Sequence, residues 1–440
     1  PTISAILDEI GKLSTKIIEP VNRLSDLSPP KIVDGEVVCS PGFIEAYRAI
    51  ADGGWVGLSA GSEFGGMALP LVLNSCANEM MGSACLSLSL NPLMTQGQIE
   101  ALETHGSSEI KNIYLPNLIS GKWSGTMNLT EESAGSDVGS LRTVAHPVGD
   151  GSYEITGQKI YISWGEHNLT ENICHLVLAR LPDSAEGTRG ITLFLVPKFI
   201  PTGSNTIGKR NNLNALSLEQ KMGLHGSPTA VMSYNKAKGW MIGEPNCGMA
   251  AMFTMMNNAR LGVGVQGISQ AERAFQKAML FAKNRVQGRS LISDGVGTII
   301  DHADVRRNLL TMKALTSAAR AICLDTAAST DFARVSGSKE LYDRASFLTP
   351  IAKAFGTDVG CKVTDLGIQV HGGLGFIESA GASQLYRDAR ITTIYEGTNG
   401  IQAIDLVNRK LADGGDAAFK IMEKFQLLEK ECLDSNLVDR

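Results

Sequence analysis

The chain has 440 residues, more than one ordinary hydrophobic core accommodates, so we expect two or three domains. Its composition, 43% hydrophobic but only 6% aromatic, with 47 glycines, is typical of a helix-rich globular protein. The formal net charge of -5, without a long run of one sign, argues against nucleic acid and against anionic membranes as partners.

Residues 1–123 are predicted to form an N-terminal helical domain. Apolar residues recur there at helical spacing, and Gly-, Pro- or Ser-rich breaks at 28–30 and 61–66 separate the segments. The apolar positions are Ile6, Ile10, Leu13, Ile17, Val21, Phe43, Ala46, Ile50 and Trp55.

Residues 124–240 are predicted to form a middle β-domain, because the helical period gives way to short alternating or apolar runs. These runs lie at 153–156, 159–163, 175–179, 190–196 and 231–234. Several short strands at such spacing favour a compact sheet or barrel over alternating β-α-β units.

Residues 241–411 return to the helical period and are predicted to form a C-terminal helical bundle. Its two apolar stripes are Ala271, Ala274, Phe275, Ala278 and Ala282, and Leu309, Met312, Leu315, Ala319 and Ile322. Residues 412–440, with a charged helix predicted over 419–433, are interpreted as the start of a C-terminal extension. The fold class expected from these zones is α+β.

The cysteines and histidines indicate neither disulfides nor a metal site. None of the eight cysteines forms a Cys-x-x-Cys pair, so we expect buried, reduced thiols. The seven histidines show no ligand spacing, so no metal is predicted. No apolar run reaches the length of a membrane span. Because the chain starts at Pro1, a targeting segment could precede it.

Two motifs resemble functional sites but lack the context that such sites need. Residues 262–267 match G-x-G-x-x-G, yet no strand precedes them and no βαβ unit surrounds them. Small residues that let helices pack closely are the favoured explanation. Ser136 does not lie in a G-x-S-x-G elbow, so a serine hydrolase has little support.

Glu396 is the most informative single residue. It lies between Tyr395 and Gly397, directly before a new amphipathic helix, and Gly397 has no Cβ to obstruct a ligand that approaches the carboxylate. A purely structural explanation also exists, since Asn399 and Gln402 fit a helix capping box. The following residues that fit a buried helical stripe are Ile401, Ile404, Val407 and Leu411.

Four segments, in this order, carry a family resemblance. They are Thr-Glu-Glu-Ser-Ala-Gly-Ser-Asp at 130–137, Gly-Gln-Lys-Ile-Tyr-Ile-Ser at 157–163, Arg-Val-Gln-Gly-Arg at 285–289, and Gln-Val-His-Gly-Gly at 369–373 with Ile-Tyr-Glu-Gly-Thr-Asn-Gly-Ile-Gln at 394–402. Over nearly its whole length the chain resembles the acyl-CoA dehydrogenase family of flavoproteins. The resemblance implies an N-terminal helical domain, a middle β-barrel domain and a C-terminal four-helix bundle. It also implies FAD between the last two domains, reaching across a subunit interface.

The resemblance also implies roles for individual residues. Glu396 matches the catalytic base, which removes a proton beside the thioester carbonyl while hydride leaves the β-carbon for the flavin. The residues that match FAD contacts are Leu129, Thr130, Tyr161, Ser163, Arg285, Gln287, Gln369, Gly372, Gly373 and Thr398. Those that match acyl-CoA contacts are Ser136, Arg260 and Gly397.

Some residues differ from the family pattern, and one position distinguishes between its branches. Some branches place the base just before the arginine that matches Arg260, but Ala259 stands there, so Glu396 is preferred. Glu132 replaces a common proline, Met127 replaces an aromatic residue, and Tyr161 replaces a frequent tryptophan. The last two changes are expected to alter flavin exposure and redox tuning.

Within the family, segments 125–131, 252–257 and 396–403 resemble the larger-subunit branch that includes 3-(methylthio)propanoyl-CoA dehydrogenase. The branch implies a short or medium acyl-CoA substrate, an electron-transferring flavoprotein as acceptor, and a homodimer or dimer of dimers. An acyl-CoA oxidase remains an alternative. A DNA-binding flavoprotein of the alkylation-response type is the other, although this acidic chain lacks the basic surface it needs. The expected location is cytoplasmic, or the mitochondrial matrix in a eukaryote.

Overall fold

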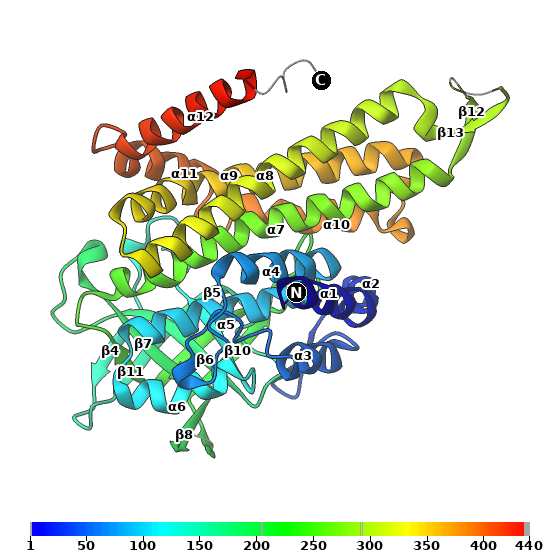
Figure 1. The fold of residues 1–440 in the computed structure, drawn as a ribbon. Helices are drawn as coiled ribbons and strands as arrows, with labels where there is room; N and C mark the ends of the chain where they lie inside the picture. The colour runs from blue at the N-terminus through cyan, green and yellow to red at the C-terminus, as the bar shows by residue number, and fades with distance from the viewer. Residues whose placement is uncertain (1, 204–205, 291, 293, 435–440) are drawn as a thin grey trace.

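The computed structural model describes residues 2–203, 206–290, 292 and 294–434, and it shows three successive zones (Figure 1). The first zone is mainly helical, as predicted. Its helices are α1 (Thr2–Leu13), α2 (Glu19–Leu27), α3 (Phe43–Asp52), α4 (Leu71–Ala84), α5 (Leu86–His105) and α6 (Ser108–Ile119).

A β-hairpin interrupts the helices of the first zone, and the sequence analysis missed it. Strands β1 (Lys31–Val33) and β2 (Glu36–Val38) pair antiparallel. Asp34 and Gly35 between them have φ of 52° and 81°. A two-residue turn with both residues in the left-handed region matches the twist of the paired strands, and Asp-Gly is a favoured sequence for it.

The middle zone is a β-barrel flanked by additional strands, which confirms the predicted architecture. Five strands pair in a closed ring, in the order β11, β5, β4, β6, β7 and back to β11. Their bounds are β4 (Val144–Pro147), β5 (Tyr153–Ser163), β6 (Asn172–Arg180), β7 (Ile191–Pro197) and β11 (Thr229–Ile242). Strand β3 (Trp123–Asn128) extends from β6, and β10 (Leu213–Leu218) extends from β11. Strands β8 (Phe199–Gly203) and β9 (Thr206–Arg210) form a separate hairpin.

The third zone is built on long helices. Three of them, α7 (Gly248–Asn284), α8 (Ala303–Ser336) and α9 (Lys339–His371), pack together with the shorter α10 (Ala382–Arg390) as a bundle. Helices α7 and α8 extend into an arm that ends in the hairpin β12 (Val286–Arg289) and β13 (Val296–Thr298) (Figure 1). Helices α11 (Asn399–Asp405) and α12 (Asp416–Asp434) follow.

The glycines of residues 262–267 serve helix packing, as predicted. A Cβ on Gly264 would lie 2.7 Å from the carbonyl oxygen of Ala352, and one on Gly267 would lie 2.2 Å from that of Gly356. Helices α7 and α9 therefore approach each other at backbone distance, which larger residues would prevent. This segment lies inside α7, so it is not a dinucleotide-binding turn.

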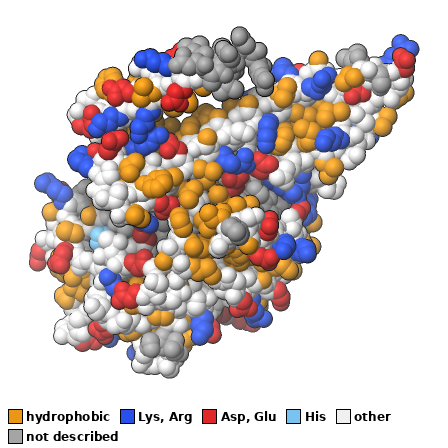
Figure 2. Space-filling view, in the orientation of Figure 1, with side chains coloured by type: hydrophobic (Ala, Val, Ile, Leu, Met, Phe, Trp, Pro, Cys, Tyr) orange, Lys and Arg blue, Asp and Glu red, His pale blue; other side chains and the backbone are white. Residues whose placement is uncertain are grey.

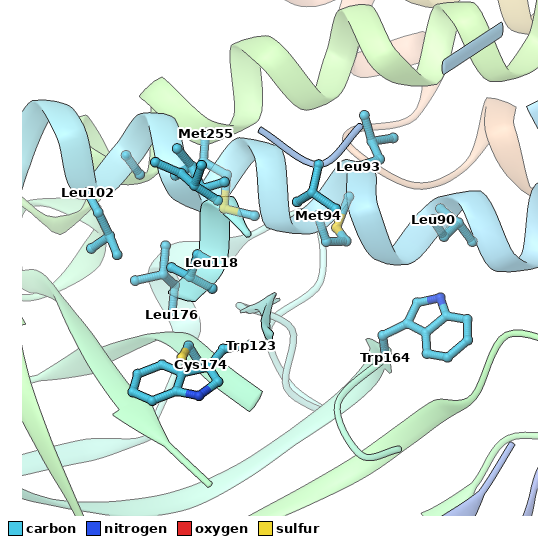
Figure 3. Packing of buried hydrophobic residues seen from close by; sticks show 14 of the residues in the cluster. Leu90, Leu93, Met94, Leu102, Leu118, Trp123, Trp164, Cys174, Leu176 and Met255 are labelled. Atoms are coloured by element: carbon cyan, nitrogen blue, oxygen red, sulfur yellow. The ribbon is translucent and has the colours of Figure 1, made fainter. Parts of the chain in front are cut away.

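The largest apolar cluster joins the first two zones to the start of α7. Figure 3 shows Leu93 and Met94 of α5 and Met255 of α7 in the same cluster as Trp123 and Cys174 of the β-domain. A cluster shared in this way fixes the relative positions of the zones. The prediction of buried cysteines is confirmed for Cys85, Cys174 and Cys323, but it is wrong for Cys247, which lies exposed just before α7.

Candidate active site

The loop that carries Glu396 has an unusual backbone. Glu396 and Gly397 have φ of 56° and 82°, both in the left-handed region, which a glutamate adopts at a cost of about 1–3 kcal/mol. Gln402 holds the loop in this shape, because its Nε2 donates to the carbonyl oxygens of Glu396 (3.1 Å) and Gly397 (3.2 Å). A strained carboxylate residue fixed by a buried amide is a candidate functional group.

The helix after this loop begins differently from the predicted capping box. The N-cap of α11 is Thr398, whose Oγ1 accepts from the N–H of Ile401 at 3.3 Å. The capping box of Asn399 and Gln402 is therefore wrong, since Gln402 is engaged by the loop carbonyls. The predicted buried stripe is also wrong, because Ile404 and Val407 are 59% and 60% exposed.

The carboxylate of Glu396 lies among buried groups. Its Oε2 is buried and has no hydrogen-bond partner among the described residues. Burial raises the pKa of Glu396 to about 7, although the Arg260 guanidinium and then the Lys353 ammonium oppose the rise. Arg260 is itself nearly buried and pairs with Asp405 at 3.2 Å. A carboxyl group whose pKa lies near the working pH suits a general base.

A second loop holds Leu129 and Thr130 on the surface of the barrel. Lys159 Nζ, fully buried in β5, donates to the carbonyl oxygen of Leu129 at 3.0 Å and to Glu131 Oε1 at 2.8 Å. The carbonyl oxygen of Thr130 accepts from the N–H of Ile160 at 2.9 Å. The sequence analysis missed Lys159; its one signal was a lysine between Ile155 and Ile162 in the alternating strand, where an apolar residue would be ordinary.

Glu131 is ionised inside this second loop. Its carboxylate accepts from Thr143 Oγ1 at 2.6 Å and from the N–H of Arg142 at 2.7 Å, besides Lys159. Burial works to raise the pKa of Glu131, but the Lys159 ammonium and these donors hold it below its usual value. The ion pair therefore fixes the chain on both sides of Thr130.

Tyr161 and Ser163 lie at the end of β5 that adjoins this loop. Tyr161 has φ of 59° and its side chain is exposed, where β5 and β11 lose their regular register. Ser163 accepts a hydrogen bond through its carbonyl oxygen from Thr126 Oγ1 at 2.8 Å. Leu129 and Tyr395 both pack against the large apolar cluster that joins the three zones.

The remaining predicted cofactor residues lie elsewhere. Arg285 follows the end of α7 and Gln287 lies in β12, and both are exposed at the tip of the arm, far from the barrel (Figure 1). Gln369, Gly372 and Gly373 are exposed at the end of α9. The rings of Phe281 and His371, which stack at 4.6 Å, join this end of α9 to the base of the arm. Within one chain, the predicted cofactor residues therefore lie in two separate groups.

Ser136, predicted to contact acyl-CoA, is exposed beside an open hollow of about 600 Å³. The hollow is lined by its neighbour Asp137 together with Ser140, Arg180, Ser184 and Thr188. No group of metal-ligating side chains is present among the described residues. In the same part of the chain, every helix is too short or too polar to cross a membrane.

Comparison with known proteins gives the family. Models of the acyl-CoA dehydrogenase N-terminal, middle and C-terminal domains match residues 40–122, 126–237 and 246–411. A 3-methylmercaptopropionyl-CoA dehydrogenase of Ruegeria pomeroyi is 47% identical and covers 97% of this chain, which spans 74% of that protein. The chain belongs to the acyl-CoA dehydrogenase family.

Other relatives agree with this assignment. A butyryl-CoA dehydrogenase of Syntrophomonas wolfei is 36% identical over 93% of this chain and 70% of its own length. The solved structure of butyryl-CoA dehydrogenase from Megasphaera elsdenii has the same fold, with a TM-score of 0.78 and 24% identity over 93% of this chain and 98% of that one. The predicted fold, family and enzyme class are confirmed: the protein is an oxidoreductase that acts on the CH–CH bond of an acyl-CoA, with FAD as cofactor.

The residues of this chain fit a flavin. The exposed Tyr161 follows Ile160, whose N–H binds the carbonyl oxygen of Thr130, and the Lys159 ion pair holds the Thr130 loop. At the tip of the arm, Arg285 offers a charged fork suited to a diphosphate. These two groups lie far apart within one chain (Figure 1).

Proposed function

We propose that this protein oxidises a short-chain acyl-CoA, with 3-(methylthio)propanoyl-CoA as the first candidate, and that Glu396 is the catalytic base. The observation that carries the proposal is the strained Glu396 loop with its buried, unpartnered carboxylate oxygen. The substrate rests on the Ruegeria pomeroyi relative, whose identity of 47% exceeds the 36% of the butyryl-CoA dehydrogenase.

In this mechanism the Glu396 carboxylate takes a proton from the carbon beside the thioester carbonyl. The negative charge then develops on the carbonyl oxygen and needs a donor. The N–H of Glu396 makes no hydrogen bond within the described part of the chain, so it is free to donate to that oxygen. The bound flavin supplies the acceptor for the hydride that leaves the β-carbon, and the product is the trans-2-enoyl-CoA.

The elevated pKa of Glu396 serves this step. A carboxylate with an ordinary pKa is a weak base, whereas one near 7 is stronger and still half ionised at neutral pH. Gln402 supports the step indirectly, because it holds the strained backbone that aims both the carboxylate and the N–H.

The proposal is tested by anaerobic mixing of the flavin-loaded protein with a panel of acyl-CoAs of increasing length that includes 3-(methylthio)propanoyl-CoA. We expect this thioester and butanoyl-CoA to bleach the flavin absorbance fastest. The matching free acids, which lack the thioester, serve as controls and should not bleach it. Faster bleaching by long acyl chains would refute the substrate, and no bleaching by any thioester would refute the function.

We also propose that two chains share each FAD and that an electron-transferring flavoprotein reoxidises it. The split between the Thr130 group and the Arg285 group supports a dimer. So do the apolar side chains exposed along the arm, where Leu280, Leu310 and Val296 are 63%, 71% and 72% exposed (Figure 2). Peroxide formed at the rate of turnover in air would instead indicate an oxidase.

The shared site is tested by mixing two variants that each lack activity. Arg285→Ala should retain FAD poorly, and Glu396→Gln should retain FAD but reduce it slowly. If sites are shared, refolding the two together creates one intact site in each mixed dimer and restores part of the activity. Activity no higher than the sum of the separate variants would contradict the dimeric site.

A further inference from the structure

Lys353, in the middle of α9, is a fully buried cation. Its side chain is 0% exposed, although lysines are almost never fully buried unless they are paired. Its Nζ donates to Asn399 Oδ1 at 2.8 Å. Among the described residues no carboxylate forms an ion pair with it. The charge of Lys353 therefore meets a neutral amide rather than an anion.

The amide of Asn399 is oriented by its other contacts. Its Nδ2 donates to Asp358 Oδ1 at 2.8 Å and to Thr357 Oγ1 at 3.0 Å, both on α9. These bonds direct the amide oxygen toward Lys353. Asn399 is also the first residue of α11, three positions after Glu396. Lys353 and its neighbours on α9 thus fix the C-terminal side of the loop that carries the base.

Two cations act on the Glu396 carboxyl, and they differ in how far they are neutralised. Arg260 of α7 acts more strongly on the Glu396 carboxyl, and it pairs with Asp405 of α11 at 3.2 Å. Asp405 also forms an ion pair with Arg409 at 3.2 Å. Among the described residues, Glu396 and Asp358 attract Lys353 of α9, and Asp358 is joined to it through the Asn399 amide. Burial lowers the pKa of Lys353 to about 8, so it is charged at neutral pH.

We propose that Lys353 is a positioning residue for the reaction: through Asn399 it fixes the loop of Glu396, and its uncompensated charge favours the ionised carboxylate that accepts the proton. The inference rests on the proposed function, because it concerns the base of that same reaction. It goes further in assigning part of the ionisation of the base to a residue on another helix.

The test uses two variants that change this charge in different ways. Lys353→Met removes the cation, and Asn399→Asp neutralises it with a carboxylate at its side. In each variant we expect the pH profile of anaerobic flavin reduction to move to higher pH by on the order of one unit. The rate at pH 7 should then fall about fivefold, because the ionised fraction of Glu396 drops from a half to about a tenth, and it should recover as the pH is raised. A merely structural role would lower the rate at every pH without moving the profile.

The control is Lys362→Met, which removes an exposed lysine from the same helix and should leave the profile unchanged. A second readout does not depend on turnover. The infrared band of the protonated Glu396 carboxyl, identified by its loss in Glu396→Gln, is titrated in the oxidised enzyme without substrate. An unmoved or downward-shifted midpoint in either folded variant would overturn the inference. Failure of the wild-type flavin to bleach would instead overturn the proposed function and leave this titration informative.

Discussion

Two loops carry candidate site residues, and each is anchored by a buried lysine, but the two lysines have different partners. In the barrel, Lys159 pairs with the ionised Glu131 at 2.8 Å and binds the carbonyl oxygen of Leu129. In the bundle, Lys353 binds the neutral Asn399 at the same distance of 2.8 Å. Both lysines are 0% exposed.

The different partners give the two lysines different roles: Lys159 fixes the shape of a loop, whereas Lys353 supplies a positive charge. A buried ion pair cancels its own field at long range, so the Lys159 pair fixes the Thr130 loop without adding charge to the flavin side. A buried cation beside a neutral amide keeps its field, which acts on Glu396. The barrel loop therefore depends on its lysine for stability, whereas the Glu396 carboxyl depends on its lysine, together with Arg260, for ionisation.

The largest expected effect lies in the base loop. Glu396→Gln is nearly isosteric but accepts no proton, so flavin reduction by substrate should slow by about 10²–10⁴-fold while FAD and acyl-CoA still bind. Stopped-flow absorbance under anaerobic conditions measures the rate. Glu63→Gln, at an exposed glutamate remote in sequence, is the matched control and should reduce normally. Unchanged reduction in Glu396→Gln would remove this residue from the chemistry.

The next largest effect lies in the barrel loop and concerns stability. Lys159→Met leaves Glu131 as a buried unpaired charge, so the free energy of unfolding should fall by about 3–5 kcal/mol. Urea unfolding of the protein measures it. The double variant Lys159→Met with Glu131→Gln removes both charges and should regain much of the loss. Equal stability of the single and double variants would show that the pair contributes nothing beyond its separate residues.

The two loops should also respond differently to pH. Below pH 7 the Glu396 carboxylate becomes protonated, so kcat/KM should fall about tenfold per pH unit, and it should level off above pH 7. Glu131 has a folded pKa below its unfolded value, so its stabilisation is present above about pH 4.5 and is lost only as the pH falls further. At pH 5.5 we therefore expect slow reduction with FAD still retained, measured by steady-state rates and by filtration. Loss of both together would contradict the comparison.

The sequence predicted most of the architecture because the spacing of apolar residues is a property of local sequence. The stripes at 271–282 and 309–322 lie on α7 and α8, and the alternating runs lie in barrel strands. It did not predict the hairpin at 31–38, whose strands are only three residues each. Both lysines were missed for a different reason: their partners Glu131 and Asn399 are 28 and 46 residues away in the chain, so only folding reveals the pairs.

The smallest effect is expected from substitutions of Thr398, which test whether this residue contacts FAD or only caps a helix. It was predicted to contact FAD, whereas the structure shows it as the N-cap of α11. Thr398→Ala should cost about 1 kcal/mol of unfolding free energy through the lost cap. Thr398→Ser keeps the hydroxyl and should retain both the cap and any FAD contact. If the alanine variant loses FAD affinity well beyond its loss of stability while the serine variant does not, the hydroxyl contacts the cofactor. If stability and affinity fall together, Thr398 acts on the base loop only by starting the helix that follows it.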